Sequence, residues 1–145
     1  MPKMASRPGP PRGLRRVQLS VGLLGVLSML PPYVGPPLGL ELDVGSDIEV
    51  VDHVLPGAVA ALCAGLAALR SRRGGTVPGG ALSLALPSGA FLAGLWQTAT
   101  HAPLVVEAGG SQTPWGAVLL HSAAGPLITL LALWLTVEAS AAATE

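Results

Sequence analysis

Charged side chains are scarce in this chain, and long segments lack them altogether. Only 11% of the 145 residues are Asp, Glu, Lys or Arg, against about 25% in soluble domains. Four windows contain none of them: residues 17–40, 53–69, 74–106 and 108–137. A helix of a soluble domain needs a polar face, and these windows have no charged residue with which to make one. The pattern therefore disfavours a soluble helical domain.

The chain also lacks the residues that several kinds of site require. Cys63 is the only cysteine, which excludes a disulfide framework and CxxC chemistry and leaves Cys63 as a small packing residue. No serine stands in a nucleophile elbow, and no glycine-rich phosphate loop is present. The basic residues number eight and are divided between two segments, which disfavours nucleic-acid binding. We therefore predict that the protein is not an enzyme.

The uncharged windows have the length of membrane spans. A bilayer core accommodates about 20 predominantly apolar residues as a helix, so each window can hold one span. We predict an all-α membrane protein with four transmembrane helices at about residues 17–35, 50–69, 80–100 and 115–137, surrounded by the lipid bilayer. A basic start followed by a short apolar run also fits a cleavable signal peptide, although no small-x-small cleavage site follows at residues 31–37. Cleavage of the first span therefore stays an open alternative.

The two signs of charge fall on different sides of this arrangement. All eight basic residues lie in residues 1–16 or 70–73, whereas six of the eight acidic residues lie in the two intervening connections. Positively charged loops stay in the cytoplasm, so we predict a multi-pass protein of the cell membrane with both termini cytoplasmic. Residues 1–16 are predicted to be a disordered basic tail, residues 138–145 a short C-terminal tail, and residues 41–57 an acidic outer loop that leads into the second span.

Small residues indicate how the spans pack. Gly57, Ala61 and Gly65 recur at every fourth position, a spacing that lets helix backbones approach closely in lipid. We therefore expect these three residues to form a close helix contact, with Ala60 on a neighbouring face.

The two halves of the chain resemble each other. The sequence Pro-Leu-Gly-Leu-Glu at residues 37–41 is similar to Pro-Leu-Val-Val-Glu at 103–107, and His53 and His121 each precede a Pro-Gly or Gly-Pro break by three or four residues. The pattern predicts two duplicated two-helix hairpins in parallel orientation, while chance similarity in a simple composition is the alternative.

Ionisable residues that fall near the spans gather in the outer half of the predicted topology. They are Asp52, His53, His101, Glu107 and His121. Such groups are costly in a membrane and usually face the interior of a bundle. In the simplest interpretation His121 bonds Ser122 or the backbone carbonyl near residue 122 that Pro126 leaves without a donor. Asp52 with His53 forms a solvated helix start. His101 then caps a helix that ends before Pro103, because the residue preceding a proline disfavours helix.

A second interpretation brings these groups together. Three imidazoles with carboxylates are a ligand set for Zn²⁺ or Cu²⁺, and two imidazoles on facing helices can ligate a haem. The chain contains no HxxxH, CxxCH or HExxH motif, so the sequence identifies neither a metal nor a cofactor.

A basic tail, four spans and a histidine near the outer start of each even-numbered span resemble small four-span membrane proteins of high-GC actinobacteria. The resemblance covers residues 17–137, has His53 and His121 as its residue-level marks, and implies no activity. We predict a structural or accessory membrane protein, with a further copy of the chain or another membrane protein as its protein partner. The alternative is a proton- or metal-linked transporter or a haem-binding redox subunit that uses the three histidines.

Overall fold

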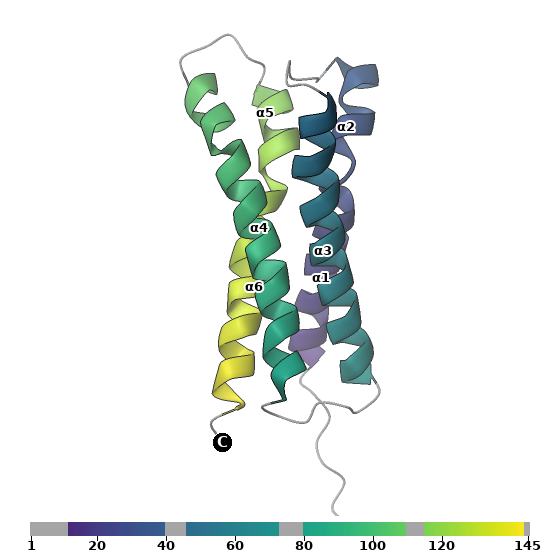
Figure 1. The fold of residues 1–145 in the computed structure, drawn as a ribbon, viewed down its shortest axis with the longest axis vertical. Helices are drawn as coiled ribbons and strands as arrows, with labels where there is room; N and C mark the ends of the chain where they lie inside the picture. Colours follow the sequence, from purple (N-terminus) through teal and green to yellow (C-terminus); the bar gives the residue numbers. More distant parts are fainter. Residues whose placement is uncertain (1–11, 40–45, 73–79, 110–114, 144–145) are drawn as a thin grey trace, which may run out of the picture.

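The computed structural model describes residues 12–39, 46–72, 80–109 and 115–143, and all regular structure within them is helical (Figure 1). The elements are α1 (Arg12–Leu27), α2 (Pro31–Val34), the 3-10 helix η1 (Pro36–Leu38), α3 (Ser46–Arg72), α4 (Ala81–Ala108), α5 (Trp115–Ser122) and α6 (Ala124–Ala141). The long helices lie side by side along one axis. The prediction of an all-α protein is therefore confirmed.

Two helices begin earlier in the chain than predicted. Helix α1 begins at Arg12, inside the segment expected to be a disordered tail. Helix α3 begins at Ser46, so Asp47 and Glu49 lie in its first turn and not in an outer loop. Acidic residues are stabilised there by the positive end of the helix dipole. Residues 46–57 of the expected acidic loop are therefore helical, and residues 41–45 lie outside the described residues.

Proline acts differently at different positions. Helix α1 ends at Leu27, shortly before Pro31 and before the predicted end of the first span at residue 35. The last long stretch is divided into α5 and α6 at Ala123, close to Pro126. Helix α4, however, continues through Pro103 to Ala108, so the predicted end before Ala102 is wrong. An interior proline removes one backbone hydrogen bond and can kink a helix without ending it.

The helices pack in pairs around a narrow core. Helix α1 packs on α3, α4 packs on α6, and α3 and α4 join the pairs. The core consists largely of alanine, with a few larger side chains among them: Val21, Ala60, Ala64, Ala90, Ala93, Ile128, Ala132 and Leu135. Many leucines point outward, including Leu62, Leu92 and Leu130, which are each more than 60% exposed. The large apolar side chains therefore coat the outside, and the small ones let the helices approach each other.

Glycines mark the closest approaches within each pair. A Cβ added to Gly57 in α3 would lie 2.6 Å from the carbonyl oxygen of Gly25 in α1, and one added to Gly25 would lie 2.8 Å from that of Gly57. In the second pair, a Cβ on Gly94 would lie 2.7 Å from the backbone nitrogen of Thr129, and one on Gly125 would lie 2.8 Å from that of Thr98. Only glycine fits at these crossings.

The contact face of α3 differs from the predicted one. Gly65 is exposed and has nothing within 4 Å of an added Cβ, while Ala60 is fully buried. The buried face follows Gly57, Ala60, Ala64 and Ala68, which are three or four residues apart as the helical repeat requires. Gly65 therefore does not belong to the contact, and Ala60 does.

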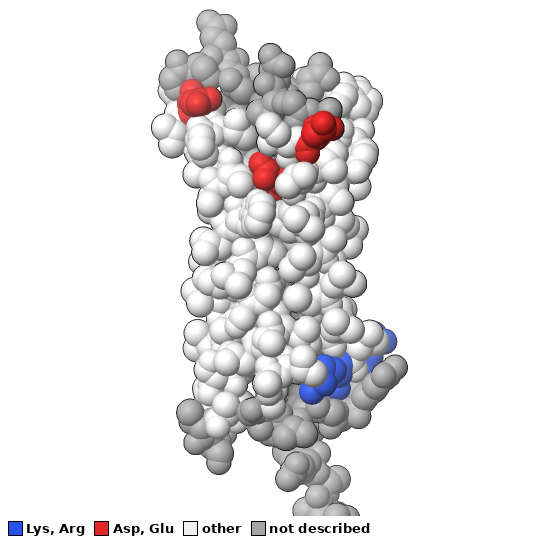
Figure 2. Space-filling view, viewed as in Figure 1, with Lys and Arg blue, Asp and Glu red and all other residues white. Residues whose placement is uncertain are grey.

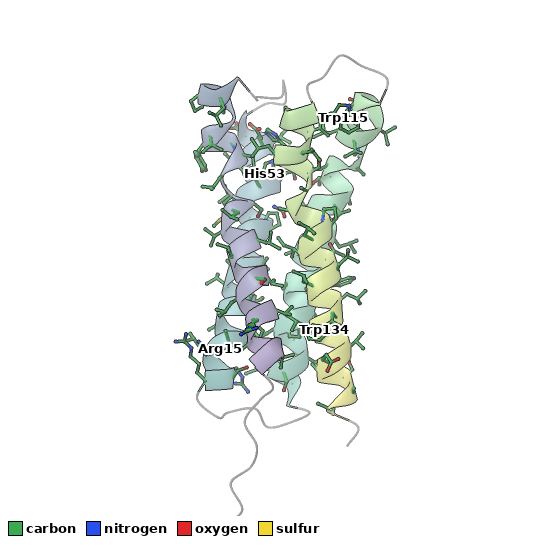
Figure 3. All side chains as sticks on the ribbon, turned by 180° about the vertical axis from the view of Figure 1, so that it is seen from behind. Arg15, His53, Trp115 and Trp134 are labelled. Atoms are coloured by element: carbon green, nitrogen blue, oxygen red, sulfur yellow. The ribbon has the colours of Figure 1, made fainter. Side chains whose placement is uncertain are left out.

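Charged residues of opposite sign lie toward opposite ends of the helices. Figure 2 shows the acidic residues Asp and Glu toward one end and Lys and Arg toward the other. His53 and Trp115 lie toward the acidic end, and Arg15 and Trp134 toward the basic end (Figure 3). Two stretches, Asp47–Arg72 with 26 residues and Trp115–Ala141 with 27, are long and apolar enough to cross a membrane.

The crossing at Gly57 allows a direct test of the packing. Gly57→Leu should lower the free energy of unfolding in detergent by about 1–3 kcal/mol, because the larger side chain overpacks against backbone atoms of α1. Gly65→Leu, on the open face of the same helix, is the matched control and should change it little. Unfolding can be followed by circular dichroism, and equal losses in the two variants would contradict the contact.

Candidate functional site

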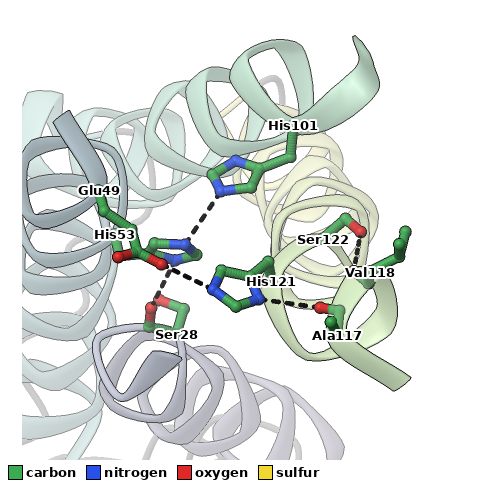
Figure 4. A network of polar contacts seen from close by, with 8 residues as sticks. All are labelled: Ser28, Glu49, His53, His101, Ala117, Val118, His121 and Ser122. Atoms are coloured by element: carbon green, nitrogen blue, oxygen red, sulfur yellow. Dashed lines mark hydrogen bonds and ion pairs between the residues drawn. The ribbon is translucent and has the colours of Figure 1, made fainter. Parts of the chain in front are cut away.

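Three histidines from three helices meet in the acidic half of the molecule. His53 comes from α3, His101 from α4 and His121 from α5, and their exposed fractions are 1%, 5% and 4%. The ring centroid of His53 lies 4.5 Å from that of His101 and 5.3 Å from that of His121, with the rings edge to face. Figure 4 shows His53 between the other two rings. We call these three residues the histidine triad.

The position of His53 follows from the crossing of α1 and α3. His53 lies one helical turn before Gly57, where the two backbones are in contact. Its Nδ1 is 3.1 Å from the carbonyl oxygen of Ser28. In a continuing helix that carbonyl would accept a bond from residue 32, but Pro32 has no N–H. The Pro31–Pro32 pair therefore leaves an acceptor at the end of α1, and His53 uses it.

The other two rings are anchored to their own helices. Nδ1 of His101 lies 2.8 Å from the carbonyl oxygen of Gln97, and Nδ1 of His121 lies 2.8 Å from that of Ala117. A carbonyl oxygen only accepts hydrogen bonds, so these contacts assign the proton to Nδ1 in each ring of the triad. Nδ1 of His101 also lies 3.0 Å from Oγ1 of Thr100, which can act as donor or acceptor. A neutral ring then presents Nε2 as a lone pair. Histidines that bind metals have this arrangement, with the other ring nitrogen donating to a backbone carbonyl or carboxylate.

The free ring nitrogens make two contacts that lack a donor. Nε2 of His53 lies 3.0 Å from Nε2 of His101, and Nε2 of His121 lies 2.7 Å from Oε1 of Glu49. With Nδ1 as the donor in each neutral ring, both contacts join two acceptors. A proton or a metal ion between the partners would satisfy both atoms of each contact. The three rings and Glu49 are therefore a candidate cation site.

Glu49 is the residue of this site that sequence analysis missed. It lies one turn before His53 on α3, and its side chain is half-buried. Sequence analysis places residue 49 in an outer loop, because the predicted span begins at residue 50. The indication available in the sequence was the i, i+4 spacing of Glu49 and His53, which places both residues on one face of a helix.

The predicted ionisable residues do not all take part. Asp52 accepts a hydrogen bond of 3.2 Å from Nε1 of Trp96 on the exposed side. Glu107 is exposed further along α4, and no hydrogen bond or ion pair joins it to a histidine in the part of the chain described. The structure thus brings together the three histidines, and it replaces these two carboxylates with Glu49.

The structure contradicts the simpler interpretations of His53 and His101. His53 is buried and not a solvated helix start, and His101 lies inside α4 and not at its end. His121 bonds the backbone carbonyl of Ala117, one turn earlier, and not the carbonyl near residue 122. Ser122 bonds the carbonyl of Val118 instead of the ring.

Gln97 is a second residue that sequence analysis missed. It is buried one turn before His101, and its Nε2 lies 3.4 Å from the carbonyl oxygen of His53. Its Oε1 has no hydrogen-bond partner in the described structure. Its backbone carbonyl anchors His101, so Gln97 links α4 to both rings.

The arrangement favours a small metal ion over a haem. Donor atoms of Glu49, His53 and His121 all lie within 4.8 Å of one another. Two Zn–N bonds of about 2 Å at a tetrahedral angle place their donors about 3.3 Å apart, so small side-chain movements would close the site. Two histidines that ligate a haem lie on opposite faces of the porphyrin. His53 and His101 touch at 3.0 Å and leave no room for one between them.

Comparison with protein-family models, with curated proteins and with solved structures finds no match to this chain. The resemblance to small four-span proteins of actinobacteria therefore stays a prediction, and function has to be inferred from the geometry of this chain.

The anchoring of the rings predicts one tautomer. In the metal-free protein, Nδ1 of His53, His101 and His121 should carry a proton, because each faces a carbonyl oxygen. Ring-¹⁵N NMR of the detergent-solubilised protein measures this, and the unfolded protein is the reference. An Nε2–H tautomer at His101 or His121 would contradict the assignment.

Proposed function

We propose that this protein is a four-span membrane protein, with both termini in the cytoplasm, that binds a transition-metal ion in the outer half of its helices. Two stretches have the length and apolarity of a span. Helix α4 has 28 residues, and α1 is followed along the chain by α2 after a short break. A coat of exposed leucines over a core of small residues suits a lipid environment, in which association depends on close packing.

The charge distribution supports this topology. Arg15, Arg16, Arg70 and Arg72 lie on the described parts of α1 and α3 that meet at one end, and Asp47, Glu49 and Asp52 lie toward the other. Positive charge is retained on the cytoplasmic side of a membrane. The histidine triad then lies toward the outer face.

Matching glycine contacts support the duplicated hairpins. A Cβ on Gly25 meets the backbone nitrogen of Ala61 at 2.8 Å, and a Cβ on Gly94 meets that of Thr129 at 2.7 Å. These two pairs differ by 69 and 68 positions. The first and second helices of the pairs therefore cross in the same way, as expected for two parallel repeats of one hairpin.

Two of the histidines are related by the same offset in sequence as the glycine contacts. His53 and His121 are also 68 positions apart, and each lies four residues before a crossing glycine, Gly57 or Gly125. Their meeting follows if the two hairpins pack side by side in the same orientation. His101 has Pro32 at the position 69 residues earlier, so the third ring belongs to the second hairpin alone.

The observation that carries the metal proposal is the common anchoring of three buried rings. Each Nδ1 faces a backbone carbonyl, and two of the three Nε2 atoms face each other at 3.0 Å. Imidazole is a good ligand for zinc, copper, iron and nickel. A purely structural role would be served by apolar residues, which avoid placing acceptors against one another. The geometry therefore favours the metal-linked alternative over a structural or accessory protein without a ligand.

One observation favours a second candidate function. The separation of 3.0 Å between Nε2 of His53 and Nε2 of His101 is the length of a hydrogen bond, so a single proton between them also satisfies both acceptors. A proton-linked membrane protein would use the same residues. Metal binding by the purified protein separates the two candidates.

The topology predicts the location of reporter domains. Fusions at residues 45, 74, 110 and 145 should report outside, inside, outside and inside in turn, because the basic segments are retained in the cytoplasm. Two adjacent fusion points on the same side would contradict four spans. A reporter fused at residue 45 that has lost the first span would reveal that this span is cleaved.

The triad predicts one bound metal ion per chain. After treatment with a chelator and titration with Zn²⁺, the wild-type protein in detergent should bind one equivalent, while His53→Ala should lose this site. His101→Gln provides a second test that retains a polar side chain, and circular dichroism checks that both variants are folded. Glu107→Gln is the control and should bind as the wild type does. Failure of the wild-type protein to bind Zn²⁺, Co²⁺ or Cu⁺ would overturn the metal proposal in favour of the proton.

A further inference from the structure

Glu49 is the acidic residue that contacts a ring of the histidine triad. Its Oε1 lies 2.7 Å from Nε2 of His121. The side chain of Glu49 is 12% exposed, against 1% for that of His121. The carboxylate therefore stands at the solvent side of the site, with the ring behind it.

The contact of Glu49 with His121 joins two acceptors. Nδ1 of His121 donates to the carbonyl of Ala117, so a neutral ring offers its lone pair to a carboxylate. A metal ion between Nε2 and Oε1 would satisfy both atoms and leave the anchor to Ala117 in place. The same ion has His53 within reach, since donor atoms of Glu49, His53 and His121 lie within 4.8 Å of one another.

The candidate ligands come from both hairpins and include a single carboxylate. Glu49 and His53 belong to α3, and His121 belongs to α5. At the position 68 residues after Glu49, where the second hairpin has its equivalent of His53 in His121, stands Ala117. The site is thus symmetrical in its histidines and asymmetrical in its charge.

Resting on the metal-binding function proposed above, we propose that Glu49 is the carboxylate ligand of the bound ion and makes the site selective for divalent ions such as Zn²⁺ and Co²⁺ over Cu⁺. Neutral imidazoles supply no negative charge. A divalent ion held by them alone leaves two uncompensated positive charges in a largely buried site, and the ionised carboxylate reduces these to one. A buried charge is costly unless it is paired.

Cu⁺ differs from the divalent ions in its charge. Bound by imidazoles alone it leaves one positive charge, the same as a divalent ion with Glu49 included. Carboxylate oxygen also suits harder ions than Cu⁺. Loss of the carboxylate should therefore weaken divalent ions far more than Cu⁺.

The experiment compares three proteins: the wild type, Glu49→Gln and Asp52→Asn. Asp52 is the matched control, because it lies on the same helix and bonds Trp96 instead of a histidine. Competition with chromophoric chelators measures the affinities for Zn²⁺, Co²⁺ and Cu⁺ in detergent. Glu49→Gln should lower those for Zn²⁺ and Co²⁺ by more than about 100-fold, beyond what a lost supporting contact costs, and that for Cu⁺ by less than about tenfold. Asp52→Asn should match the wild type.

The visible spectrum of bound Co²⁺ gives an independent readout. Four-coordinate Co²⁺ absorbs strongly, so the bands of the wild-type complex should weaken or shift in Glu49→Gln and stay unchanged in Asp52→Asn. Glu49→Asp, which keeps the charge on a shorter side chain, should retain the preference for divalent ions at reduced affinity.

The outcomes separate this inference from the metal-binding function itself. Wild-type protein that binds none of the three ions would overturn the metal proposal. Wild-type protein that binds Zn²⁺ while Glu49→Gln binds it equally well would overturn the role of Glu49 alone. Equal losses for Zn²⁺ and Cu⁺ in Glu49→Gln, with the helical content unchanged, would overturn selectivity by charge.

Discussion

The burial of three imidazole rings in a narrow core is the constraint on which the rest of the structure depends. A buried polar group has to be hydrogen-bonded, and each ring meets this requirement with Nδ1 on a backbone carbonyl. Because all three anchors use Nδ1, the Nε2 atoms are left to contact one another or Glu49. The same bonds that make the burial tolerable therefore bring acceptor atoms of neutral rings against one another and against Glu49. Removing one of these Nδ1–carbonyl bonds would allow its ring to rotate, and the three rings would no longer share one orientation.

The anchors exist because glycine and proline act together near the rings. Reciprocal contact of Gly25 and Gly57 brings α1 against α3, and Pro32 leaves the carbonyl of Ser28 without its helical donor. Either feature alone would be insufficient, since an open carbonyl at a distant helix would not reach His53. Small residues at the crossings hence position a polar site, in addition to bringing the helices together.

Sequence analysis predicted the helical class, and its second interpretation brought the three histidines together. It was wrong about Gly65, because residues at every fourth position drift by about 40° per step around a helix and leave the contact face. It was wrong about His101, because a proline inside a long packed helix removes one bond without ending the helix. Glu49 was missed because apolar periodicity does not fix where a helix begins, and the charged first turn of α3 resembles a loop.

The proposed metal site depends on two residues at which the two hairpins differ. His53 and His121 occupy equivalent positions, whereas Glu49 and His101 have Ala117 and Pro32 as counterparts. Two equivalent hairpins would place like rings against each other, with no charge to balance an ion. The additional imidazole and the carboxylate, one from each hairpin, would supply a further donor and a negative charge in the proposed site. In the proposed site, the crossing geometry of the hairpins brings the rings together, and these two unpaired positions determine which cation they hold.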